Sequence, residues 1–408
     1  MASSIKATFN QLHTKGVQDI ELSDNPQASA FTYQFKRIPN FAQHKTMQQF
    51  TEAIGFGKTV TINIENFGDL LSGLELYIRL PPLPLASGST YTGWTNSVGY
   101  VMIDTVEFVV GGVTLVRQTG LMMEAYDYIT TPMDKRAGLD IMTGRFDTTR
   151  VLPIDALGTR DIYVPLRFWF TKKLSQSFPL FLAQKHPVQV RIKLRPFHEL
   201  VTYDGTTPPP EMAIMDAGMI ATYTVLSDED KASLTSHPSV SYLFEQYQTQ
   251  VIQEISDGAI SIKIPLDVSN VIKELVWVFV ETDSEANNDW TNFGRRDTNA
   301  PGGELMLTAG LLVNSLERQM KLPESYWRLV ETLNHHARSS TDRNIYCMSF
   351  SQAPEANQPS GTLNASLYDT IELTVDFIPN LPRCRFYSLA VSYNTITFTD
   401  GEIKLTYL

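Results

Sequence analysis

The chain has 408 residues, of which 43% are hydrophobic and 19% charged, and its formal net charge is −11 at pH 7. This balance is typical of folded globular protein and excludes a disordered tail, while the length predicts two domains. The acidic charge, with no run of Lys or Arg longer than two, argues against direct binding of nucleic acid, which usually requires a basic stripe.

Apolar runs and cysteines exclude further classes of protein. Wholly apolar runs are short, as in Leu275 to Val280, whereas a membrane-spanning helix needs about 20 such residues. Residues 1–16 lack the apolar stretch of a secretory signal, so we expect folding in a cytosol. Only Cys347 and Cys384 are present, too few for a disulfide framework, and we expect two buried, unreactive thiols.

Strand signals dominate the chain from its N-terminal third onward. Segments rich in β-branched and aromatic residues alternate or run apolar, and glycine-containing turns such as Gly111-Gly112 and Asp257-Gly258 lie between them. These segments are Thr59 to Glu65, Leu74 to Leu80, Thr105 to Val110, Val188 to Leu194, Ala259 to Ile264, Glu274 to Glu281, Thr370 to Val375 and Phe386 to Tyr393. The pattern predicts β-sandwiches or barrels.

Few helices and one linker interrupt this pattern. Ser227 to Leu234 opens with a Ser-x-x-Asp cap, and Glu324 to Leu333 is the other helical segment that we expect. Three consecutive prolines make Asp204 to Glu211 the best candidate linker, because proline interrupts both helices and central strands. The two resulting halves echo one another loosely, Val109 to Arg117 resembling Leu311 to Arg318, which favours a duplication.

Ordered motifs along almost the whole chain resemble the major capsid proteins of nucleocytoplasmic large DNA viruses. The N-terminal part carries Gly16 to Ile20, the aromatic-basic segment Phe31 to Arg37, Trp94 to Gly99, and Tyr163 to Phe170, which resembles that family's Phe-Trp-Phe strand. Further matching positions, to which the resemblance assigns structural roles, are Asp104, Gly111, Gly112, Trp169, Phe170, Trp277, Trp327, His335, His336, Pro359, Ser360 and Gly361.

The resemblance implies an all-β double jelly roll, two consecutive eight-stranded sandwiches with few short helices. It divides the chain into an N-terminal arm (1–24), a first jelly roll (25–204), a linker (205–221) and a second jelly roll (222–408). It also implies a homotrimer that forms a pseudo-hexagonal capsomer of an icosahedral capsid, found in the virion and assembled in the host cell cytoplasm. Neighbouring capsomers, minor capsid proteins and a penton protein are the implied partners, and an indirect contact with an inner membrane layer is left open. The alternatives are a minor capsid or vertex protein of the same fold, or a carbohydrate-binding lectin.

The candidate metal and modification motifs of the chain are better explained by structural roles. The adjacent His335 and His336 would point to opposite faces of a strand, and no third ligand follows at zinc-like spacing, so we expect no metal, cofactor or catalytic residue. Asn364 begins the only Asn-x-Ser/Thr sequon, beside strand-like sequence, and we expect it to be unglycosylated. The Pro359-Ser360-Gly361 turn predicts a positive φ at Gly361.

Overall fold

The computed structural model describes residues 2–14, 16–27, 40–146, 158–236, 239–296, 303–399 and 401–407. The chain divides into two compact units, Met1–Asn40 and Phe41–Leu408. In the first unit, within the predicted arm, lie the helices α1 (Ala2–His13) and α2 (Val17–Ser23). The predicted segment Phe31 to Arg37 lies outside the described residues.

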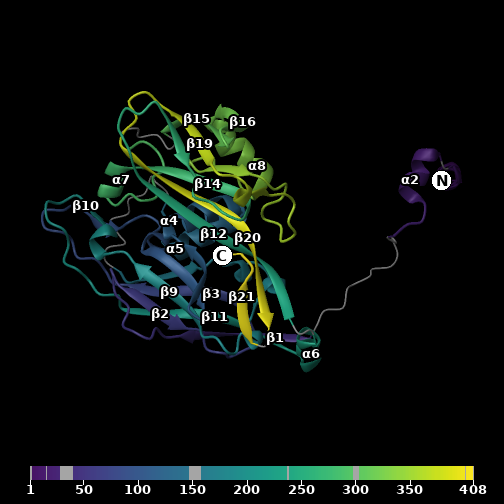
Figure 1. Cartoon of the computed structure of the whole chain (residues 1–408), viewed down its shortest axis with the longest axis horizontal. Coiled ribbons are helices and arrows are strands. Elements are labelled where there is room, and N and C mark those ends of the chain that lie inside the picture. The colour runs from purple at the N-terminus through teal and green to yellow at the C-terminus, as the bar shows by residue number, and fades with distance from the viewer. Residues whose placement is uncertain are drawn as a thin grey trace. The chain divides into compact units, whose positions relative to one another are not determined.

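A first β-sandwich occupies the N-terminal half of the larger unit (Figure 1). Its two sheets run in the orders β1-β11-β3-β7 and β2-β9-β5-β6. The strands are β1 (Phe41–Gln48), β2 (Thr59–Asn63), β3 (Leu70–Leu80), β5 (Ile103–Val110), β6 (Val113–Gln118), β7 (Arg160–Pro165), β9 (Val188–Leu194) and β11 (Asp216–Leu226). Short additions are β8 (Phe178–Pro179), which pairs with β3, and the separate pair β4 (Thr92–Trp94) and β10 (Val201–Tyr203).

A second sandwich follows in the C-terminal half. Its sheets run in the orders β12-β20-β14-β17 and β13-β19-β15-β16. The strands are β12 (Ser239–Ile255), β13 (Ser261–Pro265), β14 (Val271–Glu281), β15 (Met306–Val313), β16 (Leu316–Pro323), β17 (Tyr346–Ser349), β19 (Ile371–Phe377) and β20 (Cys384–Thr399). Two short strands, β18 (Leu363–Asn364) and β21 (Glu402–Leu405), pair with β14 and β20.

The two sandwiches have the same topology. Setting aside the short additions and counting the eight principal strands of each half in chain order, both halves join the first, eighth, third and sixth strands in one sheet. In both, the other sheet joins the second, seventh, fourth and fifth strands. This repeated order is that of two consecutive jelly rolls, so the predicted fold class is confirmed.

The strand pairing also locates the end of the first sandwich. β11 pairs along its length with β1 and β3, both in the first half. The sequence prediction placed residues 205–221 in a linker and began the second jelly roll at residue 222, whereas the pairing keeps residues 216–226 with the first sandwich. The proline-rich segment lies between β10 and β11, so one more strand of the first sandwich follows it.

Two hydrophobic clusters form the core. One fills the second sandwich between its sheets, around Trp277, Phe279 and Trp327. The other fills the first sandwich and continues onto the opposite face of β14 and β20, where Val276, Val278 and Leu389 belong to it. β14 is therefore buried on both faces, which explains why its sequence reads as a continuous apolar run instead of alternating.

Several helices of the described residues are missing from the sequence prediction, among them the two longest of the larger unit. α4 (Gly120–Thr130) and α5 (Met133–Thr143) lie in the first half, and nearly every residue of α4 is buried. A helix that is buried all round shows no amphipathic stripe, which removes the periodic signal used to recognise helices. The remaining α-helices are α3 (Val98–Val101), α6 (Asp228–Thr235), α7 (Thr282–Ala286) and α8 (Glu331–His335).

Other helical predictions have clear outcomes. α6 begins after Ser227, whose hydroxyl accepts from the Asp230 backbone N–H as the cap pattern predicts. The predicted strand through Trp169 and Phe170 is wrong, because β7 ends at Pro165 and Trp169–Thr171 forms a 3₁₀ turn. Among the described residues, the other 3₁₀ turns are Leu174–Gln176, Leu180–Leu182, Phe197–Glu199 and Ala365–Leu367. A π-helical turn, Tyr326–Val330, precedes α8. Within the described ranges, no helix is long and apolar enough to cross a membrane.

Candidate functional site

Helix α4 lies where the first sandwich meets the second (Figure 1), and we call the contacts between first-half and second-half residues in this region the seam. The backbone N–H of Arg338 donates to the carbonyl of Ile129 at 3.0 Å. The Tyr126 hydroxyl donates to Glu274 Oε1 at 2.7 Å, and Arg343 binds Glu124. Each contact joins a residue of α4 to the second half of the chain, so α4 connects the two sandwiches through polar groups as well as through the shared core.

Glu124 is the centre of one buried ion cluster in the seam. Its carboxylate is 1% exposed and accepts from Arg343 Nη1 at 2.6 and 2.7 Å and from Arg145 Nη1 at 2.7 Å. Arg136 Nη2 lies 3.7 Å away. Burial alone would raise the pKa of Glu124, but the arginines hold it below its usual value. The carboxylate therefore stays ionised and balances part of the positive charge around it.

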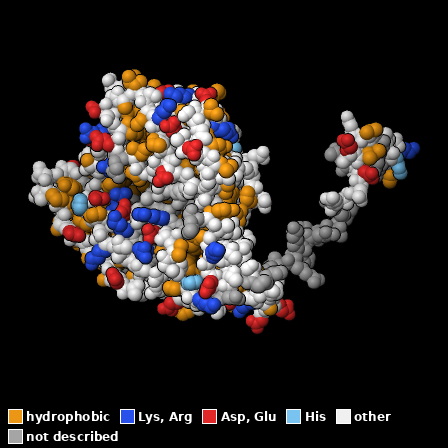
Figure 2. All heavy atoms as spheres, in the orientation of Figure 1, with side chains coloured by type: hydrophobic (Ala, Val, Ile, Leu, Met, Phe, Trp, Pro, Cys, Tyr) orange, Lys and Arg blue, Asp and Glu red, His pale blue; other side chains and the backbone are white. Residues whose placement is uncertain are grey.

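The same arginines surround Tyr128 and line a cavity. The guanidinium carbon of Arg338 lies 4.0 Å from the centre of the Tyr128 ring, and those of Arg136, Arg145 and Arg343 lie 4.9 to 5.3 Å from it. The cavity has a volume of about 1640 Å³ and is lined by residues of both halves. Basic side chains gather on the side where Figure 1 shows β10 and α7 (Figure 2). Acidic groups, including Glu285 and Asp342, share this lining, so the surface is mixed in charge.

A second ion cluster follows the seam along β12 and β14. Lys172, from the first half, and Lys273, on β14, both bind the carboxylate of Glu245 on β12. Lys273 is fully buried and also donates to the Pro354 carbonyl at 2.6 Å. Burial tends to raise the pKa of Glu245, yet the two ammonium groups lower it to about 2. Glu245 therefore remains ionised, and it links a first-half residue to the central strands of the second sandwich.

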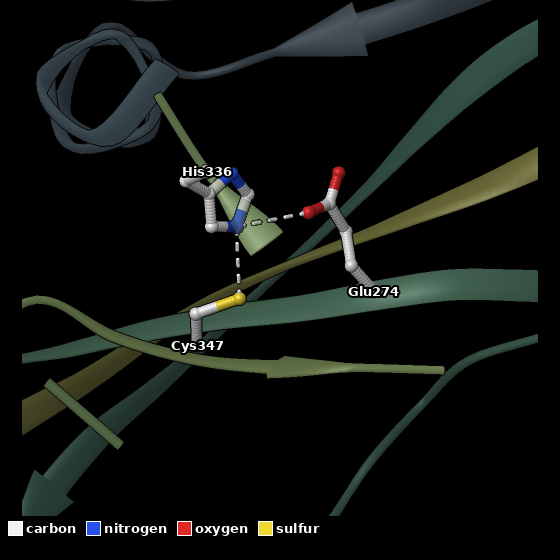
Figure 3. Close-up of side chains that lie close together, drawn as sticks. All are labelled: Glu274, His336 and Cys347. Carbon is white, nitrogen blue, oxygen red and sulfur yellow. Dashed lines mark hydrogen bonds and ion pairs between the residues drawn. The ribbon is translucent and has the colours of Figure 1, made fainter. Parts of the chain in front are cut away.

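Beside this cluster, Glu274, His336 and Cys347 meet in the interior (Figure 3). His336 Nε2 lies 3.1 Å from Cys347 Sγ and 3.3 Å from Glu274 Oε2. Burial and the nearby carboxylates of Glu274, Glu331 and Glu355 raise the pKa of the Cys347 thiol well above its usual range. A cysteine nucleophile requires the opposite, a lowered pKa and access to substrate, so this arrangement does not form a hydrolytic Cys-His site.

The histidine pair has a different setting from the one predicted. His335 is the last residue of α8 and His336 its C-cap, so the pair does not lie on a strand. The two side chains nevertheless diverge: His335 Nδ1 lies 3.2 Å from the Gln352 carbonyl, whereas His336 points to Cys347 and Glu355. The sequence prediction assumed strand geometry and considered only ligands at zinc-like spacing. It therefore missed the Cys347 and Glu355 side chains that the fold brings to His336.

The remaining motif positions occupy turns and packed sites. Gly111 and Gly112 form the turn from β5 to β6 with φ of 58° and 84°. Trp169 and Phe170 are buried, as are Trp277 and Trp327, whose ring centres lie 6.0 Å apart. Asp104 is on β5 and pairs with Lys193 Nζ at 2.7 Å.

Hydrogen bonds from Ser351 and Ala353 fix the Pro359-Ser360-Gly361 segment. The Ser360 hydroxyl lies 2.7 Å from that of Ser351 and accepts from the Ala353 backbone N–H at 2.9 Å. Gly361 has the predicted positive φ, 142°. Asn364 is exposed at the end of β18. None of these contacts assembles a reactive group, and the functions of the motif positions stay predictions.

Several basic residues of the first half are paired with carboxylates. Lys172 binds Glu245, Arg191 Nη1 lies 2.9 Å from Glu107, and Arg195 Nη1 lies 3.3 Å from Glu199. Their charges are thus partly balanced on the protein itself, which weakens any attraction for phosphate groups.

The chain matches two family models in succession. Residues 29–229 match the model described as major capsid protein N-terminus, and residues 233–402 match the model described as large eukaryotic DNA virus major capsid protein. The major capsid proteins of Phaeocystis pouchetii virus and Pyramimonas orientalis virus are 25% and 26% identical, each alignment covering 97% of this chain and 98% of the relative.

Solved structures show the same fold. A chain of the quasi-atomic capsid structure of the virus PBCV-1 superposes with a TM-score of 0.79 at 20% identity, covering 93% of this chain and all of that one. The Faustovirus major capsid protein gives 0.73 at 12% identity, covering 94% of each chain. The matching sequence models, the full-length relatives and the repeated strand order agree: the chain belongs to the major capsid proteins of large eukaryotic DNA viruses, which are structural proteins of the virion and not enzymes.

Proposed function

We propose that three copies of this chain assemble into a pseudo-hexagonal capsomer that tiles an icosahedral capsid. The observation that carries the proposal is the identical strand order of the two sandwiches. A chain with two similar units presents six such units in a closed ring of three, which gives a nearly hexagonal outline from a threefold interface. Such an outline can tile a surface with one kind of subunit.

The seam supports this proposal, because a hexagonal outline requires a fixed angle between the two sandwiches. Glu124 with Arg343 and Lys172 with Glu245 are directional contacts between the halves, and both carboxylates are almost completely buried. Buried ion pairs tolerate few alternative arrangements, since a displaced partner leaves an unpaired charge in the interior. We therefore assign to the seam the role of fixing the angle between the sandwiches.

We also propose revised domain boundaries and structural roles for the motif residues. The first jelly roll would span residues 41–226 and the second residues 239–408, with α6 in the connection between them. The pairing of β11 with β1 and β3 and the end of the first family match at residue 229 support this division. The motif residues would shape turns, as Gly111 and Gly361 do, or fill the core, as Trp277 does.

The proposed partners are neighbouring capsomers, minor capsid proteins and a penton protein, with assembly in the host cell cytoplasm and indirect contact with an inner membrane layer. The family of capsid proteins supports assembly with other capsid components. The net charge of −11 and the paired basic residues support contacts with protein over direct contacts with the genome.

Light scattering after size-exclusion chromatography tests the capsomer directly. The chain mass of 45.9 kDa predicts a trimer of 3 × 45.9 = 137.7 kDa. We expect this mass for the unmodified protein and for Glu107→Gln, whose carboxylate binds arginine outside the seam. Glu124→Gln should reduce the trimer fraction if the angle set at the seam matters. A monomer at all concentrations would contradict the trimer, and an unchanged trimer in Glu124→Gln would contradict the role of the seam.

A further inference from the structure

Three possible metal ligands converge from separate parts of the second sandwich. Glu274 comes from β14, His336 from the residue after α8 and Cys347 from β17. Their ligand atoms lie within 4.8 Å of one another and all three residues are buried (Figure 3). A thiol, an imidazole and a carboxylate form a donor set that suits Zn²⁺. Family resemblance assigns no metal to these positions.

The surrounding contacts orient two of the donors toward the centre. His336 Nδ1 lies 3.2 Å from Glu355 Oε1, a carboxylate that also accepts from the Ala337 backbone N–H at 2.9 Å. In the tautomer whose Nδ1–H donates a hydrogen bond to Glu355, the lone pair of Nε2 faces Cys347 and Glu274. Zinc-binding histidines commonly have such a carboxylate partner on their second nitrogen, because it fixes the tautomer and the ring orientation.

Glu274 provides a second, independent indication. Its Oε1 accepts from Tyr126, whereas its buried Oε2 has no hydrogen-bond partner among the described residues. A buried carboxylate oxygen without a hydrogen bond is costly, and such an atom needs a compensating group. This oxygen lies 3.3 Å from His336 Nε2. The separation is close to the value of about 3.3 Å between N and O ligands of a tetrahedral zinc ion.

The carboxylates of the cluster outnumber its ammonium groups. Lys172 and Lys273 pair with Glu245, and Lys273 Nζ also lies 3.8 Å from Glu274 Oε1. A third carboxylate, Glu355, contacts His336 Nδ1, and its side chain is 33% exposed. These five side chains carry one excess negative charge, which Zn²⁺ together with a Cys347 thiolate would balance.

We propose that Glu274, His336 and Cys347 bind one Zn²⁺ ion that joins β14, β17 and the end of α8. On binding, the Cys347 thiol loses its proton to solvent, and Sγ, Nε2 and Oε2 each donate a lone pair to the metal. Sγ would withdraw from its present 3.1 Å distance from Nε2 to about 3.5 Å, the separation expected from zinc–ligand bonds of about 2.3 and 2.0 Å at the tetrahedral angle. A water would complete the tetrahedron. The site would stabilise the second sandwich beside the seam.

Metal analysis of the full chain, purified without chelator from zinc-supplemented culture, tests the proposal. We expect one zinc per chain by inductively coupled plasma mass spectrometry. Replacement of zinc by Co²⁺ should give the intense thiolate-to-cobalt absorption in the near ultraviolet, which arises only with a Cys ligand. This measurement uses the unmodified protein. Glu355→Gln, which alters the carboxylate behind His336, should weaken zinc binding by about 10- to 100-fold.

Matched variants distinguish the ligands from their neighbours. His336→Gln and Cys347→Ser should lose the bound zinc, whereas His335→Gln and Cys384→Ser, which change the adjacent histidine and the other buried thiol, should keep it. Unmodified protein without zinc and without the cobalt absorption would overturn the proposal. Zinc retained in both His336→Gln and Cys347→Ser would overturn the assignment of ligands. Because the cobalt spectrum is recorded on unmodified protein, a folding defect in the variants would not obscure the result.

Discussion

Replacing Glu245 by Gln removes the carboxylate that joins Lys172 and Lys273 and leaves two ammonium groups without their partner. The energetic consequence follows from the pKa of Glu245, which burial alone would raise but the two lysines lower from 4.5 to about 2. One pKa unit corresponds to about 1.4 kcal/mol, so the ionised carboxylate contributes about 3 kcal/mol to folding at neutral pH. We expect Glu245→Gln to lower the free energy of unfolding by about this amount at pH 7.

The sign of the pH dependence is fixed by the direction of this shift. A carboxyl group whose folded pKa is depressed stabilises the protein above its unfolded pKa, and the contribution disappears as pH falls through the folded pKa. For Glu245 this window runs from pH 4.5 down to about 2. The difference between the unmodified protein and Glu245→Gln should therefore fall from about 3 kcal/mol at pH 7 to about 1 kcal/mol at pH 3.

Urea unfolding followed by tryptophan fluorescence and circular dichroism at both pH values measures this difference, and coinciding transitions allow free energies to be compared. Asp376→Asn is the control. The pKa of Asp376 is also about 2, set by burial, which raises it, and by bonds from Lys321 and other groups, but its side chain is 30% exposed. Solvent screening should limit this loss to below about 1 kcal/mol. Equal losses for both variants at pH 7, or a Glu245→Gln loss that does not shrink at pH 3, would refute the reasoning.

Two further substitutions test the backbone and the core. Gly361→Ala should lower the free energy of unfolding by about 1–3 kcal/mol, because φ is 142° and a new Cβ would lie 2.6 Å from the Phe350 carbonyl oxygen. Gly138→Ala, in α5 with open space around the added methyl group, should leave the stability unchanged or raise it. Equal urea midpoints for the two variants would contradict this prediction. Trp327→Ala should cost about 3–5 kcal/mol, since the side chain is buried and its indole N–H donates to the Ala309 carbonyl at 3.0 Å. Leu333→Ala, 70% exposed nearby, should change stability by less than about 0.5 kcal/mol, and a similar loss in both would show that Trp327 is not a core anchor.

The sequence was most informative where one face of a strand is buried. Val188 to Leu194 was predicted with the bounds of β9, because its residues alternate strictly between buried and more exposed positions. The apolar run of Glu274 to Glu281 predicts a strand, although the sequence does not indicate which segments cover its two faces. Strand existence is a local property, and the fold class followed from it together with the family resemblance.

Long-range polar contacts were beyond sequence reasoning. No sequence motif singles out Glu124, and its partner Arg343 lies in the other half of the chain. The seam depends on which face of a buried helix meets which loop, and neither periodicity nor spacing contains that information. The same holds for Cys347 and His336. Their common neighbour Glu274 comes from a strand that pairs with β17, whereas His336 follows α8, so the three meet only in the folded chain.

The placement of charge at the seam follows from what each kind of interaction provides. The apolar cluster already runs from the first sandwich onto β14 and β20, so burial of hydrophobic surface holds the two halves together. Buried ion pairs add little net stability compared with apolar packing, but they restrict the geometry, because charges must meet their partners or remain unpaired. A capsid subunit is repeated many times, and an error in the angle between its halves is passed to each neighbour. Glu124 with Arg343 and Lys172 with Glu245 therefore lie where the proposed capsomer would need a defined angle more than additional stability.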